Sequence, residues 1–334
     1  MENPTRIFTD IDYDKKGKQI GYLYLPYSVT RSAYGNIAVP IAVIANGRGP
    51  TVLLQAGTHG DEYEGQIALC KLIRALDAGS VAGRVILLTA TNLPAAMAGT
   101  RVSPLDGGNL NRAYPGDPDS GPTKAIAHYV DSVIFPMTDY HLDLHSGGSS
   151  LDYQPFVSVR RSDDPDLDRR AMSAMLAFGG PFGIVWRHSL ERGFTDDAAI
   201  RRGIVSLGGE FGGGGAVARD AVGLIERGIR RFLAHAGIID GKDAPPPEGD
   251  MRLLEVSDRD YFVLSPDAGL FEFAAVIGEE VVADQLCGQI HFVDDPARSP
   301  VPAHFRRAGT VICTRHFGRV ERGDCVAHLA TPLG

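Results

Sequence analysis

The stretch TVLLQAG, residues 51–57, is a short and unbroken apolar run that ends in a glycine. Such a run is typical of a central β-strand whose two faces are both buried. The glycine loop after it opens a predicted helix over residues 64–76, and a second buried strand is predicted over residues 84–92. A strand, a helix and another strand in this order indicate an α/β domain with a parallel or mixed central sheet.

The same alternation continues on both sides of this unit. Residues 19–45 alternate in polarity, are rich in β-branched side chains and predict two or three strands. Further strands are predicted over 139–145 and 203–211, and helices over 123–135 with Thr123 as the cap, 164–178 and 217–236. The polar, glycine-rich residues 99–122 contain no predicted element. Because long loops in compact domains usually carry function, this one is a candidate active-site loop.

The stretch GKDAPPPEGD, residues 241–250, has the composition of a semi-rigid linker. We therefore predict a catalytic domain over residues 1–240 and a small β-barrel or sandwich domain over residues 251–334. A chain of 334 residues suggests two domains at roughly 150 residues each, with one large domain plus an appendage as the alternative. The last lysine of the chain is Lys242, so the β-domain cannot carry a cofactor on a lysine arm.

Composition excludes several classes of protein. The chain has 33 lysines and arginines against 41 aspartates and glutamates, a formal charge of −8, and no basic run that would bind nucleic acid. Its amino terminus lacks the apolar core of a signal peptide, and no apolar run approaches the roughly 18 residues of a membrane span. The four cysteines show no CxxC spacing that would suggest a zinc ribbon. These features predict a cytoplasmic protein without nucleic-acid or membrane partners.

The loop after the first buried strand carries the HxxE pair His59 and Glu62. An imidazole and a carboxylate three residues apart, in a turn that leads into a helix, can converge on one ion. HxxE alone often arises by chance, but in open α/β sheets ligands collect at the carboxyl ends of the strands, where this pair lies. Zinc is the natural occupant of a nitrogen and oxygen site, and a catalytic zinc needs one more protein ligand and an open position.

The third ligand is expected from another strand end, and the stretch YHLDLHSGG, residues 140–148, is the candidate. Period-two alternation places His141, Asp143 and His145 on one face of this strand and leucines on the other. His145 lies where the strand meets the glycine loop and is the predicted ligand. Asp143 is predicted to accept a hydrogen bond that fixes a histidine tautomer. His141 is interpreted as structural.

Hydrolysis of an amide also requires a base and a cationic donor. Glu210 lies between glycines after an apolar strand and is the candidate general base, since a glutamate with its pKa near the working pH suits that role. Arg101 and Arg112 flank two asparagines in the long loop. A guanidinium can stabilise the charge of a tetrahedral intermediate, and its planar fork suits a carboxylate.

Taken together, the motifs GTHGDEYEG, NLPAAMAGTRVSPLDGGNLNRAYPG, DLHSGG and GGEFGGGG resemble the succinylglutamate desuccinylase and aspartoacylase family, relatives of the zinc carboxypeptidases. The likeness covers roughly residues 50 to 215 and implies a three-layer domain with a mixed central sheet. It implies one zinc ion per chain held by His59, Glu62 and His145. The implied roles of the other residues are general base for Glu210, polarisation of the scissile carbonyl for Arg101, and binding of the substrate α-carboxylate for Asn111 and Arg112.

Within that family the whole chain is most similar to the group that removes acetate from Nα-acetyl-L-2,4-diaminobutyrate in ectoine degradation. The similarity includes the opening DYDKKGKQIGYLYLP and the carboxyl-terminal CTRHFGRVERGD. Two residues depart from the pattern. Phe211 follows the candidate base where leucine is expected, at a place where it would reshape the acyl pocket, and His141 replaces an aliphatic residue.

The leading hypothesis is zinc-dependent hydrolysis of the amide bond of an N-acyl amino acid, with a small molecule as substrate. A diaminobutyrate substrate carries a side-chain ammonium, for which Asp196 or Asp197 is the expected partner. The alternatives are an N-succinylglutamate desuccinylase or an aspartoacylase-type enzyme, a carboxypeptidase whose extended substrate the β-domain would crowd, and a non-catalytic protein with a structural zinc. The β-domain is expected either to cap the active site or to form the interface of a homo-oligomer.

Overall fold

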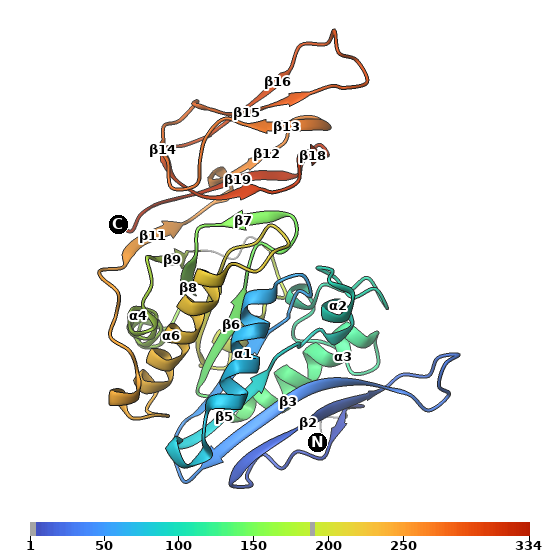
Figure 1. The fold of residues 1–334 in the computed structure, drawn as a ribbon, viewed down its shortest axis with the longest axis vertical. Coiled ribbons are helices and arrows are strands. Elements are labelled where there is room, and N and C mark those ends of the chain that lie inside the picture. Colours follow the sequence, from blue (N-terminus) through green and yellow to red (C-terminus); the bar gives the residue numbers. More distant parts are fainter. Residues whose placement is uncertain (1–4, 188–190) are drawn as a thin grey trace.

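A computed structural model describes residues 5–187 and 191–334, so residues 1–4 and 188–190 of the predicted first domain lie outside the described part. Its main feature is a large mixed sheet (Figure 1). In spatial order, the strands of this sheet are β1 (Phe8–Thr9), β2 (Gly17–Pro26), β3 (Asn36–Asn46), β5 (Gly83–Leu88), β4 (Thr51–Ala56), β6 (Tyr140–His145), β10 (Val205–Glu210), β8 (Phe156–Arg160), β9 (Phe182–Trp186), β11 (Arg252–Val256), β19 (Cys325–Pro332), β17 (Gly309–Arg315) and β14 (Glu280–Val281).

The direction of the strands confirms a mixed sheet. β4 pairs in parallel with β5 and β6, and β6 pairs in parallel with β10. β2 and β3 are antiparallel, as are β3 and β5 and also β10 and β8. Every residue of β4 is buried, as expected for a strand covered on both faces. Four parallel strands side by side, β5, β4, β6 and β10, therefore point their carboxyl ends toward the same edge.

Helices cover both faces of this sheet. α1 (Tyr63–Ala75), α4 (Pro165–Phe178) and α6 (Arg219–His235) pack against one face. α3 (Pro122–Tyr129) and α5 (Thr195–Ile200) pack against the other, where two hydrophobic clusters separated by the sheet give the three layers visible in Figure 1. The remaining helical segments are α2 (Leu93–Ala98), a π-helical turn over Val130–Ile134, and short 3₁₀ turns at Ala78–Ser80, Leu110–Arg112, Phe135–Met137, Gly241–Asp243 and Arg259–Tyr261.

The prediction that Thr123 caps a helix is wrong. The helix begins one residue earlier, at Pro122, a residue whose fixed φ suits the first helical position. The Thr123 hydroxyl instead donates to Asp106, 2.7 Å away, and the Thr123 amide donates to the same carboxylate. These two bonds tie the long loop 99–122 to the start of α3.

The carboxyl-terminal strands continue the large sheet and add a second one, at the top of Figure 1. β11 pairs in parallel with β9 and antiparallel with β19. β7 (Leu151–Tyr153) and β12 (Phe262–Leu264) pair with β17 and β19 beside the main path. The second sheet contains β16 (Val301–His304), β15 (Leu286–His291), β13 (Gly269–Phe273) and β18 (Arg319–Val320). Phe156 and Ile184 of the first part share a hydrophobic cluster with these strands, and the boundary at residues 241–250 stays a prediction.

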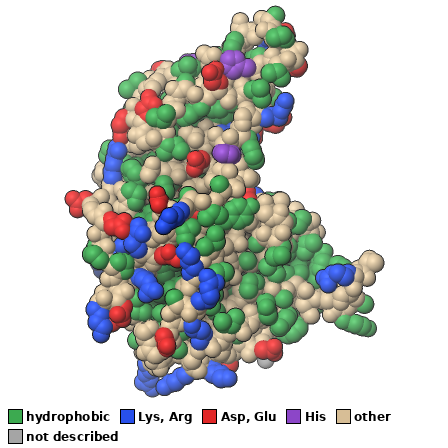
Figure 2. Space-filling model, in the orientation of Figure 1, with side chains coloured by type: hydrophobic (Ala, Val, Ile, Leu, Met, Phe, Trp, Pro, Cys, Tyr) green, Lys and Arg blue, Asp and Glu red, His purple; other side chains and the backbone are tan. Residues whose placement is uncertain are grey.

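The surface over α1, α4 and α6 carries charges of both signs. Figure 2 shows lysines and arginines mixed with aspartates and glutamates on this side. One ion pair, Lys71 with Glu226 at 2.9 Å, joins α1 to α6. None of the helices in the described part of the chain has both the length and the apolar content needed to cross a membrane.

Candidate active site

The candidate residues converge because three neighbouring parallel strands end at the same level. In the register of β6 with its neighbours, Ala56 lies opposite Leu144, and Glu210 lies opposite His145. His145 and Glu210 are therefore the last residues of adjacent strands, and His59 follows β4 after three residues. Its loop packs closely on α2, since a Cβ added to Gly60 would lie 2.0 Å from the backbone of Ala95.

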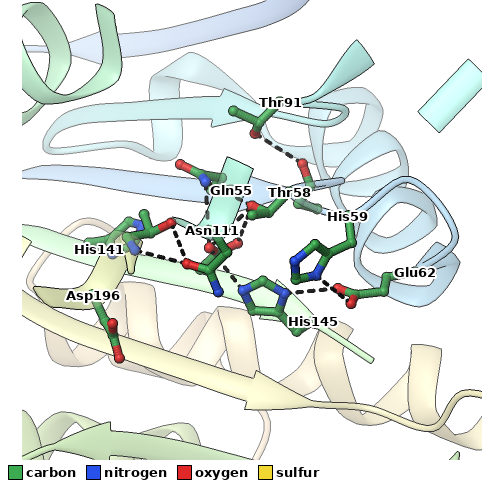
Figure 3. A network of polar contacts seen from close by, with 12 residues as sticks. Gln55, Thr58, His59, Glu62, Thr91, Asn111, His141, His145 and Asp196 are labelled. Atoms are coloured by element: carbon green, nitrogen blue, oxygen red, sulfur yellow. Dashed lines mark hydrogen bonds and ion pairs between the residues drawn. The ribbon is translucent and has the colours of Figure 1, made fainter. Parts of the chain in front are cut away.

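His59, Glu62 and His145 form one compact cluster (Figure 3). The Nδ1 atoms of His59 and His145 lie 2.6 and 2.8 Å from the two carboxylate oxygens of Glu62. One ligand atom from each residue lies within 4.8 Å of the other two. Their side chains are between 2% and 11% exposed, so the cluster is shielded from water but reaches the cleft.

The hydrogen bonds around His59 leave a lone pair that faces Glu62. Asn109 Oδ1 accepts the backbone N–H of Asn111 at 3.0 Å, which identifies it as the oxygen of the amide. His59 Nε2, 3.1 Å from that oxygen, must then carry the proton. Burial lowers the pKa of His59, which favours the neutral ring with a bare Nδ1. A bare nitrogen 2.6 Å from a carboxylate oxygen is favoured where a cation lies against both atoms. The Arg101 guanidinium lies 3.3 Å from this nitrogen, and two imidazoles with a carboxylate also fit a metal ion.

Asp143 holds His145 in the matching orientation. The Nε2 of His145 lies 3.0 Å from Asp143 Oδ2, and the Thr58 hydroxyl donates to the same carboxylate at 3.0 Å. Burial opposes charge on His145, but the carboxylates of Asp143 and Glu62 raise its pKa well above the usual value. Burial would likewise raise the pKa of Glu62, yet the two histidines lower it overall. The cluster therefore favours positive charge at its centre.

Glu210 is the ionisable group beside this cluster that has the properties of a base. Burial, together with the negative charge of Glu62, raises its pKa to about 8. Its Oε2 atom is buried and accepts no hydrogen bond from any described residue. The carboxylate lines the cleft and is therefore available to a substrate or a water molecule.

The arginines of the loop 99–122 line the same cleft. Arg101 Nη1 lies 3.3 Å from His59 Nδ1 and 3.5 Å from Glu62 Oε1, so its guanidinium adjoins the candidate metal-binding cluster. Arg112 pairs with the carboxylate of Glu191 and stacks on Phe194, 4.1 Å from the ring centre.

Asn111 lies between these two arginines and has a structural contact of its own. Its Oδ1 accepts the backbone N–H and the hydroxyl of Thr195, at 2.9 and 3.0 Å, and so anchors the first turn of α5. It also lines the cleft.

The cleft has a volume of about 260 Å³. Besides residues expected from the sequence, it is lined by Tyr153, Phe156, Ser158, Arg160, Trp186, Glu191, Phe194, Leu207, Gly208, Gly209 and Phe262. Three of these residues alternate along β8: Phe156, Ser158 and Arg160. The period of two would have placed them on one face if the sequence analysis had predicted this strand. Phe262 arrives from the carboxyl-terminal region, and no local signal in the sequence connects it to the motifs.

The aromatic side of the cleft rests on a buried histidine. His328 stacks on Phe262 with ring centres 4.1 Å apart and on Trp186 at 5.4 Å. Neither of its ring nitrogens has a hydrogen-bond partner among the described residues, and burial lowers its pKa to about 3. His328 is therefore neutral and acts as an aromatic spacer behind the cleft.

Two further expectations are settled by packing. Phe211 does not reshape the acyl pocket, because its fully buried ring packs against Phe178 in the core and is not part of the cleft lining. His141 is structural, as predicted: it is buried, its Nδ1 lies 2.9 Å from the Ser206 hydroxyl, and its ring packs edge-on against Phe135.

Asp196 and Asp197 differ in position. Asp196 lines the cleft, whereas Asp197 faces a separate surface depression. Both lie within ion-pair distance of Arg160, at 2.9 and 3.2 Å from its Nε. Of the two expected partners for a substrate ammonium, Asp196 is the one in reach of the cleft.

Comparisons with known proteins agree with this geometry. The sequence profile of the succinylglutamate desuccinylase/aspartoacylase catalytic domain matches residues 48–236. The N-alpha-acetyl-L-2,4-diaminobutyric acid deacetylase of Halomonas elongata is 39% identical over 330 residues, which cover 99% of this chain and 96% of that protein.

Solved structures extend the likeness over the whole chain. The succinylglutamate desuccinylase/aspartoacylase of Rhodobacter sphaeroides superposes with a TM-score of 0.94 at 42% identity, and the product-bound ectoine utilization protein EutE (DoeB) of Ruegeria pomeroyi with 0.95 at 38%. Each match covers 99% of this chain and all of the other. The chain therefore belongs to the succinylglutamate desuccinylase/aspartoacylase family.

Proposed function

We propose that this protein is a zinc-dependent deacylase that hydrolyses the amide bond of an N-acyl amino acid. One observation carries the proposal: the ligand atoms of His59, Glu62 and His145 converge within 4.8 Å beside a cleft that is lined by His59, His145 and Glu210, and the Oε2 atom of Glu210 has no hydrogen-bond partner among the described residues. Three protein ligands and a nearby glutamate are the parts of a catalytic site, whereas a structural zinc is closed by four protein ligands.

His59, Glu62 and His145 would hold one zinc ion per chain, because two imidazoles and a carboxylate suit that ion. Bound there, zinc acts as a Lewis acid that polarises a carbonyl and lowers the pKa of water. Asp143 keeps the Nε2 proton of His145 in place, so that Nδ1 stays available as a ligand.

Glu210 is the general base of the proposed reaction. Its carboxylate takes a proton from the attacking water and returns it to the leaving nitrogen, which departs as a neutral amine. Arg101 donates to the carbonyl oxygen as negative charge develops there, since its guanidinium adjoins the ligand cluster. Both groups line one cleft and can reach the same scissile bond.

Arg112 and Asn111 bind the α-carboxylate of the substrate. The carboxylate of Glu191 already occupies Arg112, which supports the ability of this guanidinium to accept such a group. Glu191 is 57% exposed, so a substrate can displace it at low cost. Asn111 fixes the loop beside Arg112 through its bonds to Thr195.

The proposed substrate is Nα-acetyl-L-2,4-diaminobutyrate, cleaved to 2,4-diaminobutyrate and acetate in ectoine degradation. The names of the Halomonas elongata relative and of the Ruegeria pomeroyi structure support this choice. The second candidate, a succinylglutamate desuccinylase or aspartoacylase-type reaction, needs a cation for an additional carboxylate. Arg160 is a poor candidate for that cation, because Asp196 and Asp197 already neutralise it.

We also propose that residues 1–240 are the catalytic domain, residues 241–250 the linker, and residues 251–334 a β-domain that caps the active site. Phe262 supports the capping role, because this carboxyl-terminal residue lines the cleft. The close pairing of β11 with β9 would hold the two parts together.

A substrate panel tests the proposed function. Amine release would be measured from Nα-acetyl-2,4-diaminobutyrate, N-succinylglutamate and N-acetylaspartate, each with zinc-loaded and with chelated protein. We expect release from the diaminobutyrate compound only, and only with zinc. Release from another compound would keep the chemistry and reject the substrate. Bound zinc without release from any of them would favour a non-catalytic zinc protein.

A further inference from the structure

The residues of β8 that line the cleft change in character along the strand. Phe156, Ser158 and Arg160 face the cleft in turn, so the series runs from an aromatic ring through a hydroxyl to a cation. Four residues of a β-strand span about 13 Å, so Phe156 and Arg160 mark two separate ends of the cleft. The two sides of a substrate therefore meet chemically different surroundings.

Phe156 lies beside the proposed base. It is directly opposite Glu210 in the antiparallel pairing of β8 with β10. Residues opposite each other in such a pair have Cβ atoms roughly 5 Å apart, and both of these side chains line the cleft. The ring of Tyr153 packs edge-on against Phe156, with ring centres 5.7 Å apart, and the Tyr153 N–H donates to the carbonyl of Gly212 at 3.2 Å. The ring pair, Tyr153 with Phe156, therefore adjoins the base and the loop that follows it.

The proposed α-carboxylate site lies at the other end of the cleft. The ring of Phe194 lies 4.1 Å from the Arg112 guanidinium and 4.9 Å from that of Arg160, so these three residues are close together. In the substrate, the carbonyl carbon bears the amide nitrogen on one side and the acyl chain on the other. With the scissile bond at Glu210 and the amino-acid part directed toward Arg112, the acyl chain is directed toward the ring pair.

The ring pair is uncharged and closely packed. Burial raises the pKa of the Tyr153 hydroxyl well above its usual value, so this group stays protonated and neutral. Phe156 is only 1% exposed, and its ring centre lies 6.4 Å from that of Trp186. Of the three arginines in the described lining, Arg101 adjoins the candidate metal-binding cluster and the other two lie at the far end. A carboxylate at the end of an acyl chain would lose its hydration against the ring pair without gaining a cation.

We propose that Tyr153 and Phe156 form the acyl pocket of the enzyme and restrict it to short, uncharged acyl groups, with Phe156 as the residue that sets the length. The inference rests on the proposed hydrolysis of an N-acyl amino acid, and it specifies which acyl groups are accepted. An acetyl group places one methyl group against the rings. A butyryl group is too long for the pocket, and a succinyl group is both too long and charged.

Three substrates with the same amino-acid part separate length from charge: Nα-acetyl-, Nα-butyryl- and Nα-succinyl-2,4-diaminobutyrate. The butyryl and succinyl groups have carbon chains of equal length, but only the succinyl group ends in a carboxylate. For the wild type we expect kcat/KM for both longer compounds to be at least about 100-fold below the value for the acetyl compound, since each methylene in a hydrophobic pocket changes kcat/KM about 10- to 200-fold.

Phe156→Val should open the pocket. We expect the kcat/KM ratio of the butyryl to the acetyl compound to rise about 10- to 100-fold, because the smaller side chain leaves room for the added methylenes. The ratio of the succinyl to the acetyl compound should change by less than about threefold, because the new space is apolar. Ratios measured on one preparation do not depend on the fraction of enzyme that is folded.

Phe156→Leu is the second variant, for the case that the loss of a buried ring prevents Phe156→Val from folding. Leucine keeps more of the volume, so the butyryl ratio should rise in the same direction by a smaller factor. Phe194→Val is the matched control, with the same substitution at the Arg112 end. Because all three substrates share the group bound there, their kcat/KM values should change by the same factor.

The outcomes separate this inference from the proposed function. A wild-type enzyme that cleaves none of the three compounds overturns the proposed function. If the wild type cleaves the acetyl compound and the folded Phe156 variants keep its acyl ratios, only the role of Phe156 is overturned. Equal gains for the butyryl and succinyl compounds would contradict exclusion by charge. An equal shift of the ratio in Phe194→Val would show general loosening of the cleft and would also overturn the assigned acyl pocket.

Discussion

The two ends of the cleft are built in different ways. At the end that we propose to ligate zinc, called the zinc-ligating end below, His145 and Glu210 are the final residues of adjacent parallel strands, and strand register alone brings them together. At the other end, Arg112 comes from a loop, Asp196 from a short helix and Phe262 from the carboxyl-terminal strands. The residues proposed for the chemistry thus lie on the most regular part of the fold, while those proposed to contact the rest of the substrate come from segments that meet only in the folded chain.

The largest expected effect is at the zinc-ligating end. Replacing Glu210 with glutamine should lower kcat about 10²- to 10⁴-fold, because the base is removed while the shape of the site is kept. Turnover and zinc content would be measured on the same preparation. The role of Glu210 as the base is contradicted if the variant retains more than a tenth of the wild-type kcat, or if the variant loses its zinc.

A smaller effect is expected at Asp143, which contacts the proposed ligand His145. Asp143→Asn removes the negative charge that holds the Nε2 proton of His145, and zinc affinity should fall about 10- to 100-fold. Competition with a chromogenic chelator measures it. Asp139→Asn is the control at the opposite end of the same chain segment, where Asp139 accepts the amide of Thr51 at 2.8 Å. Equal loss of zinc in both variants would contradict the assigned role of Asp143.

At the other end of the cleft, His328 on the aromatic side should affect the stability of the protein at acid pH. The pKa of His328 is about 3 in the fold and roughly 6.5 in an unfolded chain, so its contribution to stability is complete above pH 6.5 and declines as the pH falls toward 3. At about pH 5 the loss is about 2 kcal/mol. His328→Phe keeps an aromatic ring in the stack and removes this titration.

Urea unfolding of both proteins at about pH 8 and about pH 5 measures this contribution, because the other titrating groups cancel in the difference between them. We expect His328→Phe to lose about 2 kcal/mol less than the wild type between these two pH values. Parallel losses would show that His328 is not held neutral by burial.

The zinc-ligating end could be predicted from the sequence because each of its residues ends or follows a strongly patterned strand. TVLLQAG before His59 and the alternating YHLDLH before Ser146 both indicate a strand that stops at a polar residue. The long loop with Arg101 and Arg112 was recognisable by its length and lack of periodicity. Thr123 shows the limit of such signals, since its hydroxyl bonds Asp106 in that loop instead of capping the helix.

The remaining lining residues depend on contacts between distant segments. Arg160 and Asp196 are 36 residues apart, and neither carries a local pattern that distinguishes it from a solvated charge. Phe262 joins the cleft because β12 pairs with β19 and its ring stacks on His328. Side-chain packing of this kind depends on the relative placement of strands, which hydrophobic periodicity does not specify.

The sequence by itself determined the α/β class, the family and the group of residues around the candidate zinc site. Periodicity and strand ends depend on residues that are neighbours in the sequence, so they can be recognised without the tertiary structure. Only the tertiary structure decided that Phe211 turns into the core, that Asp196 and not Asp197 reaches the cleft, and that a carboxyl-terminal ring lines it. The physical reason is that these outcomes follow from which surfaces are buried against one another, and burial is a property of the whole chain.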